Sequence, residues 1–376
     1  MISEVALRFY EKFLIPSYKN PDFFYYVPDK DTGLWMADPD KIRPYINSFG
    51  MFDKERNIDK KEGVFRIAII GDSFINGIHV GLSNRVNDLI EKQGGGILEV
   101  LNFGISSVGT VQELFIYRNK VKKFKPDLVI LGFFIGNDVQ NNFLPLELAT
   151  GYRFLKKGFP YCEKRPDGSF YYTPAQFKNN LTNKLSYNLR KYCYTYKYVR
   201  TRLLPPLAAH FKRVPKIFDE DSIFTTWPPR YLTYGVYIPP TEQAWKDAWD
   251  ITEHVLLEFK KEVEEDKAEF LVVLLTDYVQ ILPEPKKVLE KIHGIILPEN
   301  FSVDYPNMRL ERFCKEQKID CINLLPIFRK YTYEHNLKEP YFSFNNDGHW
   351  NCLGHKTAGD ILYNYILKNY IRIDSK

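Results

Sequence analysis

The chain is poor in cysteine, and the few thiols that it has follow no regular spacing. Five cysteines occur among 376 residues, and none of them belongs to a C-x-x-C pair. An odd number at irregular spacing argues against a disulfide framework and against a zinc site built from cysteines. Scattered thiols are typical of buried side chains, and they favour a reducing compartment.

Long apolar runs and blocks of like charge are missing as well. No stretch approaches eighteen consecutive apolar residues, so the sequence predicts no membrane span. The first ten residues include acidic and basic side chains, which excludes a secretory signal and favours a short amphipathic helix. The net charge is +5 without a run of five like charges, so we expect no nucleic-acid partner.

Several widespread catalytic signatures are absent. The Gly-x-Ser-x-Gly elbow of α/β-hydrolases does not occur, and the nearest segment, 104–108, ends in valine. The sequence contains neither a Walker A loop nor a His-Glu-x-x-His helix. The glycine run 94–96 precedes a predicted strand instead of following one, which excludes a dinucleotide fingerprint there.

What the sequence does contain is a regular alternation of short apolar strands with amphipathic helices. The predicted strands are 64–70, 97–103, 127–134, 270–275 and 319–324. The predicted helices are 83–93, 110–124, 241–266, 306–317 and 353–369. This alternation predicts an α/β domain with a parallel, doubly wound sheet, and 44% hydrophobic residues suffice for a full core.

The same pattern divides the chain into three parts. Residues 1–60 are interrupted by prolines and are predicted to form an N-terminal arm laid over the surface. Residues 61–140 and 241–376 form the core, and 141–240 form a large insertion after the third strand, helical around 177–203 and without a clear strand period. Its aromatic side chains suit sugar faces or acyl chains, or else they pack a satellite core; they are Tyr152, Tyr161, Tyr171, Tyr172 and Trp227.

Polar residues stand where the predicted strands end and where the last helix begins. Ser73 follows the first strand, Gly104 ends the second, Asn137 follows the third, and Asp347 and His349 precede the last helix. A serine hydroxyl needs an adjacent base, usually histidine, and a carboxylate fixes the tautomer of that histidine. Amide donors then stabilise a tetrahedral oxyanion. These residues are the parts of a nucleophilic hydrolase that needs no cofactor.

At these positions the chain resembles the SGNH, or GDSL-type, hydrolase superfamily of esterases, lipases and carbohydrate deacetylases. The resemblance covers about 64–139 and 341–369. It implies a three-layer, flavodoxin-like sheet of order 2-1-3-4-5, with Ser73 as nucleophile, His349 as base and Asp347 as its orienter. It also implies an oxyanion hole made by the backbone amides of Ser73 and Gly104 and by the side chain of Asn137.

Two of the motifs depart from the family pattern. The third block is often Gly-x-Asn-Asp, whereas here Gly136 directly precedes Asn137. The last block is often Asp-x-x-His, whereas Asp347 and His349 are separated by one residue. This shorter form resembles SGNH branches that act in bacterial polysaccharide acylation. Because of the short spacing, Asp277, after the fourth strand, is an alternative partner for His349.

Each site residue also has a simpler interpretation. Asp72 and Ser73 could only cap the following helix, Asn137 could belong to a turn, and Gly104 could satisfy a turn that needs positive φ. We expect His79 to be structural and His355 to lie on the surface of the last helix. A metal site formed by Asp347, His349 and His355 matches no common ligand spacing.

The sequence therefore predicts a serine esterase or deacylase that acts through an acyl-enzyme on Ser73, with a small-molecule or carbohydrate ester as substrate. An O-acyltransferase with the same site and a non-catalytic carbohydrate-binding protein on the same fold are the alternatives. The location stays open between cytoplasm and bacterial envelope, and membrane association is expected only through a short or missing N-terminal segment.

Overall fold

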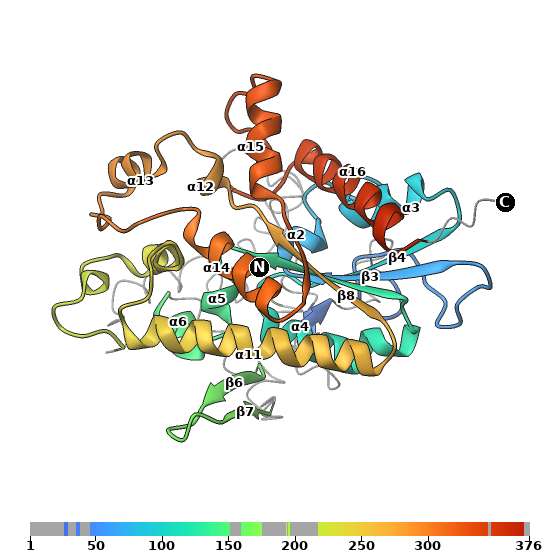
Figure 1. Ribbon diagram of the computed structural model, residues 1–376, viewed down its shortest axis with the longest axis horizontal. Helices are drawn as coiled ribbons and strands as arrows, with labels where there is room; N and C mark the ends of the chain where they lie inside the picture. Colours follow the sequence, from blue (N-terminus) through green and yellow to red (C-terminus); the bar gives the residue numbers. More distant parts are fainter. Residues whose placement is uncertain are drawn as a thin grey trace.

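The architecture is taken from a computed structural model of the chain (Figure 1). The residues it describes are 26–28, 35–37, 46–150, 159–174, 193, 195, 217–344 and 347–371.

A five-stranded parallel sheet forms the centre of the described part of the chain. Its strands are β3 (Phe65–Gly71), β4 (Leu98–Gly104), β5 (Leu128–Phe134), β8 (Glu269–Leu275) and β9 (Asp320–Asn323). Their order in space is β4-β3-β5-β8-β9, and every neighbouring pair is parallel. This is the order 2-1-3-4-5 in chain sequence, so the predicted fold class and topology are confirmed.

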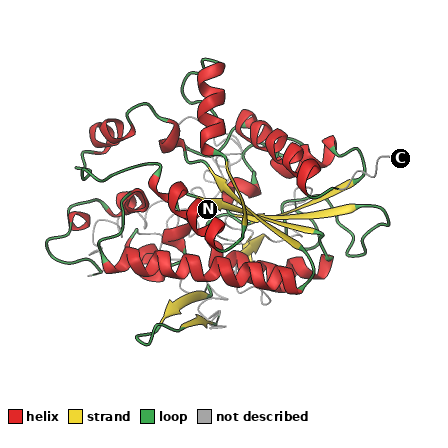
Figure 2. Cartoon of the chain, in the orientation of Figure 1, coloured by secondary structure: helices red, strands yellow, loops and turns green. Residues whose placement is uncertain are grey.

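Helices cover both faces of this sheet, which gives three layers (Figures 1 and 2). On one face lie α3 (Val86–Gln93), α15 (Leu325–Glu334) and α16 (Cys352–Asn369). On the other face lie α4 (Thr110–Ile116), α11 (Gln243–Glu265) and α14 (Tyr305–Glu316). Helix α4 continues as a π turn and a 3-10 turn to Phe124.

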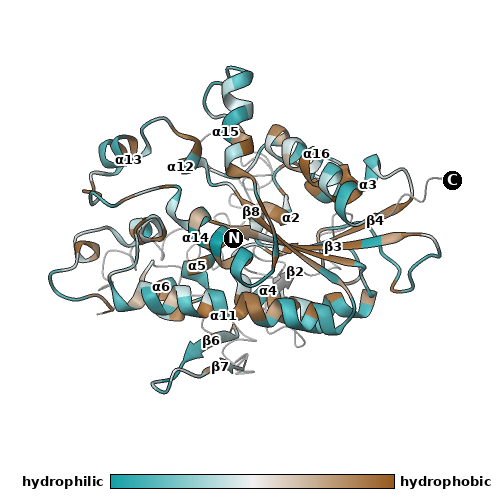
Figure 3. Cartoon of the chain, in the orientation of Figure 1, coloured by the Kyte–Doolittle hydropathy of each residue, from teal (hydrophilic) through white to brown (hydrophobic). Residues whose placement is uncertain are grey.

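Alternate residues of each strand serve the two layers. In β3, Ile67 and Ile69 pack into the α3–α16 side, whereas Ala68 and Ile70 pack into the α4–α11 side. Both faces are therefore apolar, and the strands are the brown centre of the molecule in Figure 3. This two-sided burial is why the strands appear in the sequence as continuous hydrophobic runs.

The remaining elements are shorter. They are β1 (Tyr26–Pro28), β2 (Trp35–Ala37), α2 (Ser73–Asn76), α5 (Asp138–Asn141), α6 (Leu144–Ala149), β6 (Tyr161–Lys164), β7 (Phe170–Thr173), the 3-10 helices Ile223–Thr225 (η6) and Pro229–Tyr237 (η7), α12 (Tyr278–Ile281) and α13 (Pro285–His293). None of the described helices has the length and apolar character that crossing a membrane requires.

The predicted strands and helices of the core agree with the observed ones to within a few residues at each end. The insertion was predicted less well, because β6 and β7 form an antiparallel hairpin where no strand was expected. The predicted helix around 177–203 and the predicted N-terminal helix lie outside the described residues. The division into arm, core and insertion stays a prediction.

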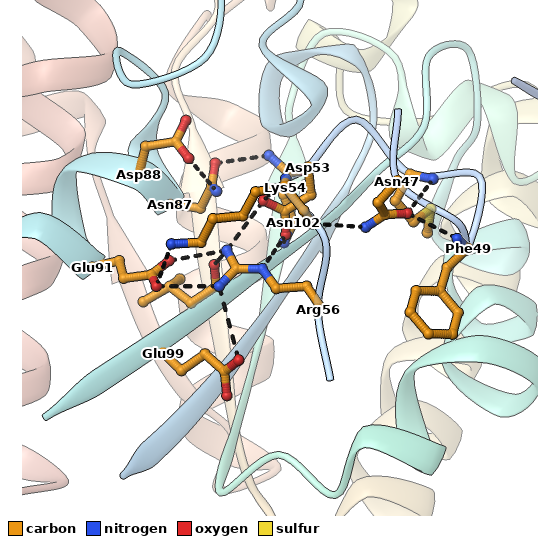
Figure 4. Close-up of polar contacts among 12 residues, drawn as sticks. Asn47, Phe49, Asp53, Lys54, Arg56, Asn87, Asp88, Glu91, Glu99 and Asn102 are labelled. Atoms are coloured by element: carbon orange, nitrogen blue, oxygen red, sulfur yellow. Dashed lines mark hydrogen bonds and ion pairs between the residues drawn. The ribbon is translucent and has the colours of Figure 1, made fainter. Parts of the chain in front are cut away.

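Some residues of the segment 46–60 are buried, among them Asp53 and Arg56, whose polar contacts are drawn in Figure 4. The side chain of Arg56 is only 3% exposed, and its guanidinium donates to both carboxylate oxygens of Asp53, at 2.8 and 3.1 Å. It also donates to Glu91 and to the Val100 carbonyl. Asp53 in turn accepts a hydrogen bond from the backbone N–H of Asn102. The bidentate pair of Arg56 and Asp53 thus ties the segment 46–60 to strand β4.

Candidate active site

The turn after β3 places Ser73 at the first position of α2. Asp72 is the N-cap residue: it is fully buried and its carboxylate accepts a hydrogen bond of 2.8 Å from the Phe74 N–H. Burial raises the pKa of Asp72, and the Phe74 N–H and the charge of His349 oppose this rise. Because Asp72 caps the helix, the hydroxyl of Ser73 is left for another partner.

Three glycines stand side by side beneath α2. Gly71 of β3 is in register with Gly104 of β4 and with Gly132 of β5. A Cβ on Gly104 would lie 2.6 Å from the backbone carbon of Ile75, and one on Gly132 would lie 2.6 Å from Cγ1 of Ile75. The absence of side chains at these positions is what lets α2 lie against the sheet edge. Gly104 does not have positive φ, so its role is this close approach.

The loop before α16 holds His349 from both sides. Trp350 is 1% exposed and donates its indole N–H to the Thr276 carbonyl at 3.2 Å. Asn351 caps α16 by accepting from two backbone N–H groups, and its side-chain amide donates to the carbonyls of Tyr341 and Ser343. His349 therefore has little freedom to leave the edge of the sheet.

The structure brings Ser73, His349 and Asp347 into one hydrogen-bonded row. Ser73 Oγ lies 2.7 Å from His349 Nε2, although the two residues are 276 positions apart. The other ring nitrogen of His349, Nδ1, is hydrogen-bonded to Asp347 Oδ1. Gly348 between them has a φ of +81°, and this left-handed conformation lets side chains two residues apart meet. The short spacing is therefore compatible with a Ser-His-Asp arrangement.

Asp277, the alternative partner of the histidine, is engaged elsewhere. Its Oδ2 accepts a hydrogen bond of 2.6 Å from the Tyr237 hydroxyl, and its side chain caps α12. Burial raises the pKa of Asp277, and the Tyr237 hydroxyl counteracts this. Among the described hydrogen bonds, none joins Asp277 to His349. In this geometry the carboxylate that orients the imidazole is that of Asp347.

Asn137 stands at the end of β5, beside the turn that holds the serine. Its Nδ2 lies 3.3 Å from Asp72 Oδ2. An amide nitrogen carries two hydrogens, so this contact fixes the side chain and leaves one donor unused. The arrangement has the form expected of a donor held beside the nucleophile.

The backbone amide of Gly104 already has a partner. Its N–H donates to Asn102 Oδ1 at 2.8 Å, and its carbonyl accepts from Asn76 Nδ2 at 2.9 Å. Asn102 also donates to the Ile75 carbonyl at 2.8 Å, so it ties α2 to β4. For Gly104 to bind an oxyanion, its N–H would have to leave Asn102. Neither Asn102 nor Asn76 was among the predicted site residues.

His79 is a further residue at the site that we had expected to be structural. Its Nδ1 lies 3.7 Å from Asp347 Oδ2, and its ring centroid lies 4.4 Å from that of His349. Burial and the charge of His349 lower the pKa of His79. The sequence offers no signal for this contact, because 268 positions separate His79 from Asp347.

His355 was predicted to lie on the surface of the last helix, but the structure buries it. It is 2% exposed, and burial lowers its pKa to about 3. Among the described residues, the side chain of a metal-ligating type that lies close to both Asp347 and His349 is that of His79, and not that of His355. His355 is therefore not part of this group of side chains.

Most described aromatics of the insertion pack against the core helices. Tyr161 is 2% exposed, and the Tyr172 hydroxyl donates to Glu258 of α11. Trp227 is 3% exposed and donates its indole N–H to the Ile296 carbonyl. For these three the satellite-core interpretation holds, and Tyr152 lies outside the described residues.

Among the described residues of the insertion, η7 contacts segments next to the site. The Thr233 hydroxyl donates to the Gly136 carbonyl at 2.5 Å, and Tyr237 donates to Asp277.

Comparisons with known proteins add a likeness of fold. No family model matches the chain, and the search of curated proteins gave no match. Solved structures that match include an acetyl xylan esterase (10% identity, TM-score 0.42, 80% of this chain and 99% of that chain). They also include an acetylxylan esterase from Geobacillus stearothermophilus (10%, 0.40, 83% and 99%) and a GDSL-like lipase from Bacteroides thetaiotaomicron (10%, 0.35, 83% and 92%). The last of these is described as GDSL-like, which is the type to which the sequence showed a resemblance. At such low identity and TM-score they carry no conclusion about the site.

Proposed function

We propose that this protein is a serine esterase or deacylase that cleaves carboxylic esters through an acyl-enzyme on Ser73. The observation that carries the proposal is the hydrogen bond of 2.7 Å between Ser73 Oγ and His349 Nε2, with Asp347 on the opposite ring nitrogen. The simpler interpretation, that Ser73 only caps α2, does not account for the hydrogen bond to His349. The residue that caps α2 is Asp72.

The first half of the reaction forms the acyl-enzyme. His349 Nε2 takes the proton of Ser73 as Oγ attacks the ester carbonyl, and the Asp347 carboxylate stabilises the resulting imidazolium. The oxyanion forms beside the free N–H of Asn137 and the backbone N–H of Ser73, which are the proposed donors together with Gly104. The intermediate collapses, and His349 gives its proton to the departing alkoxide, which leaves as the alcohol.

The second half releases the acid. A water molecule gives a proton to His349 and attacks the acyl carbonyl, and Ser73 leaves with that proton restored to Oγ. The ester is thereby hydrolysed to an alcohol and a carboxylic acid, with the enzyme unchanged. Each step uses only side chains and backbone amides of this site, together with water.

Labelling with a fluorophosphonate probe tests the assignment, because the probe phosphonylates an activated serine. We expect the wild-type protein to be labelled on Ser73, and both Ser73→Ala and His349→Ala to lose labelling. Ser106→Ala is the matched control, because Ser106 lies in the segment closest to a serine-hydrolase elbow. Labelling that persists in Ser73→Ala, or is lost in Ser106→Ala, contradicts the proposal.

A further inference from the structure

His79 places a second imidazole on the same carboxylate as His349. One ligand-type atom from each of His79, Asp347 and His349 lies within 4.8 Å of those of the other two. His79 Nδ1 and Asp347 Oδ2 are 3.7 Å apart, which is too long for a hydrogen bond. The two atoms thus lie close together without a hydrogen bond between them.

We propose that His79, Asp347 and His349 form a binding site for a divalent transition-metal ion of the Zn²⁺ class, and that the ion, when bound, switches off the nucleophile. The site itself stands on geometry alone. The inhibitory consequence rests on the proposed function, since it concerns the proton that His349 must accept.

The donor set fits Zn²⁺ better than the hard cations. Two imidazole nitrogens and a carboxylate are common zinc ligands, with a water completing the tetrahedron, whereas Mg²⁺ and Ca²⁺ prefer oxygen. Zinc–ligand bonds of about 2.0–2.2 Å place neighbouring ligand atoms about 3.4 Å apart. The pair of His79 Nδ1 and Asp347 Oδ2, at 3.7 Å, is already close to that spacing.

The surroundings of the three residues let an ion enter and let the ligands adjust. Their side chains are 20%, 39% and 25% exposed for His79, Asp347 and His349, so the site is open to solvent. His79 lies in the loop after α2, and Asp347 and His349 lie in the loop before α16. The proposed ligands thus come from two separate loops.

Binding at Nδ1 of His349 has a defined effect on the triad. In the metal-free site Nδ1 carries the proton that faces Asp347, and Nε2 accepts from Ser73. An ion on Nδ1 takes that lone pair, so the proton moves through solvent to Nε2. Nε2 then donates to Ser73 Oγ and can no longer take the serine proton. The ion also draws Asp347 away from orienting the ring, and catalysis stops until the ion leaves.

Calorimetric titration of Zn²⁺ into the chelator-treated wild-type protein tests the site without any use of activity. We expect one saturable site per chain and no comparable heat with Mg²⁺. His79→Phe keeps an aromatic ring against His349 but removes the ligand, and it should weaken Zn²⁺ binding tenfold or more. His335→Phe, a change at the exposed residue that follows α15, is the matched control and should bind Zn²⁺ like the wild type. Binding that is absent, or equal in His79→Phe and wild type, overturns the site.

The inhibitory consequence is tested by hydrolysis of p-nitrophenyl acetate with and without Zn²⁺. We expect Zn²⁺ to inhibit reversibly, with activity restored by a chelator, and the half-inhibitory concentration to rise tenfold or more in His79→Phe. Inhibition that is the same in both proteins overturns the switch. If Zn²⁺ binds in the His79-dependent way but no ester is hydrolysed by the metal-free protein, the site stands and the proposed function fails.

Discussion

Replacing Glu113 by glutamine tests whether this buried carboxyl group keeps its proton in the folded protein. Glu113 lies on α4 and is fully buried, and neither of its carboxyl oxygens has a hydrogen-bond partner among the described residues. Burial raises the pKa of Glu113 well above its usual 4.5, and the charge of Asp72 raises it further. We therefore expect folded Glu113 to keep its proton at pH values above 4.5, where the glutamate of the unfolded chain has lost it.

The effect on stability follows from proton linkage. Above pH 4.5 the unfolded chain has released the Glu113 proton, whereas the folded chain keeps it up to its raised pKa. In that window the free energy of unfolding falls as pH rises, by about 1.4 kcal/mol per pH unit for one proton. Glutamine keeps the size and carries no such proton. The wild type should therefore lose stability relative to Glu113→Gln, with this slope, as pH rises from 4.5.

Urea unfolding at pH 5, 5.5, 6 and 6.5 measures the difference between the two proteins. Glu264→Gln, which removes an exposed carboxylate of α11, is the matched control for the loss of one acidic group. A difference between wild type and Glu113→Gln that is constant over this range would show that Glu113 is ionised in the folded state. The account of the buried carboxyl group would then be wrong.

Changes at the site itself should separate the proposed roles. His349→Ala should lower kcat on the order of a thousandfold or more, and Asp347→Ala should lower it less. If Asp347→Ala keeps the wild-type rate while Asp277→Ala loses activity, then Asp277 and not Asp347 is the carboxylate that assists His349. Asn137→Ala should cost roughly 3–4 kcal/mol in kcat with KM nearly unchanged, and a pure rise in KM would make Asn137 a substrate-binding residue. Gly104→Ala should lower the free energy of unfolding by about 1–3 kcal/mol, and with it the melting temperature, because a Cβ there would lie 2.6 Å from the backbone of α2. For the same reason it should lower kcat. Unchanged melting and rate in Gly104→Ala would show that α2 does not need this close approach.

The core of the fold could be predicted from the sequence because its signals are local. Each strand is a short apolar run, and the helices between them have an amphipathic period, so the parallel direction followed from the pattern. The strand order was implied by the resemblance to the SGNH superfamily. The hairpin β6–β7 was missed because Tyr161 and Tyr172 pack beneath α11, a tertiary context that leaves no alternating pattern. The burial of Arg56 was missed for a similar reason, since its partners lie on distant segments.

The site was predictable in its motifs but not in its neighbours. Ser73 and His349 stand in short, recognisable blocks, and the structure brings them within hydrogen-bond distance. The row of glycines beneath α2 is visible only once the register of the strands is known. The approach of His79 to Asp347 depends on two loops far apart in the chain, and a single sequence contains no trace of it.

Trapping the acyl-enzyme tests the central claim most directly. The protein is mixed with p-nitrophenyl acetate, quenched in acid within the first turnovers, and measured by intact and peptide mass spectrometry. The account predicts a burst of p-nitrophenol, a mass increase of one acetyl group per chain, and its location on the peptide that contains Ser73. Hydrolysis of the ester without any acetylated Ser73 peptide, or acetylation that persists in Ser73→Ala, would contradict the proposed nucleophile.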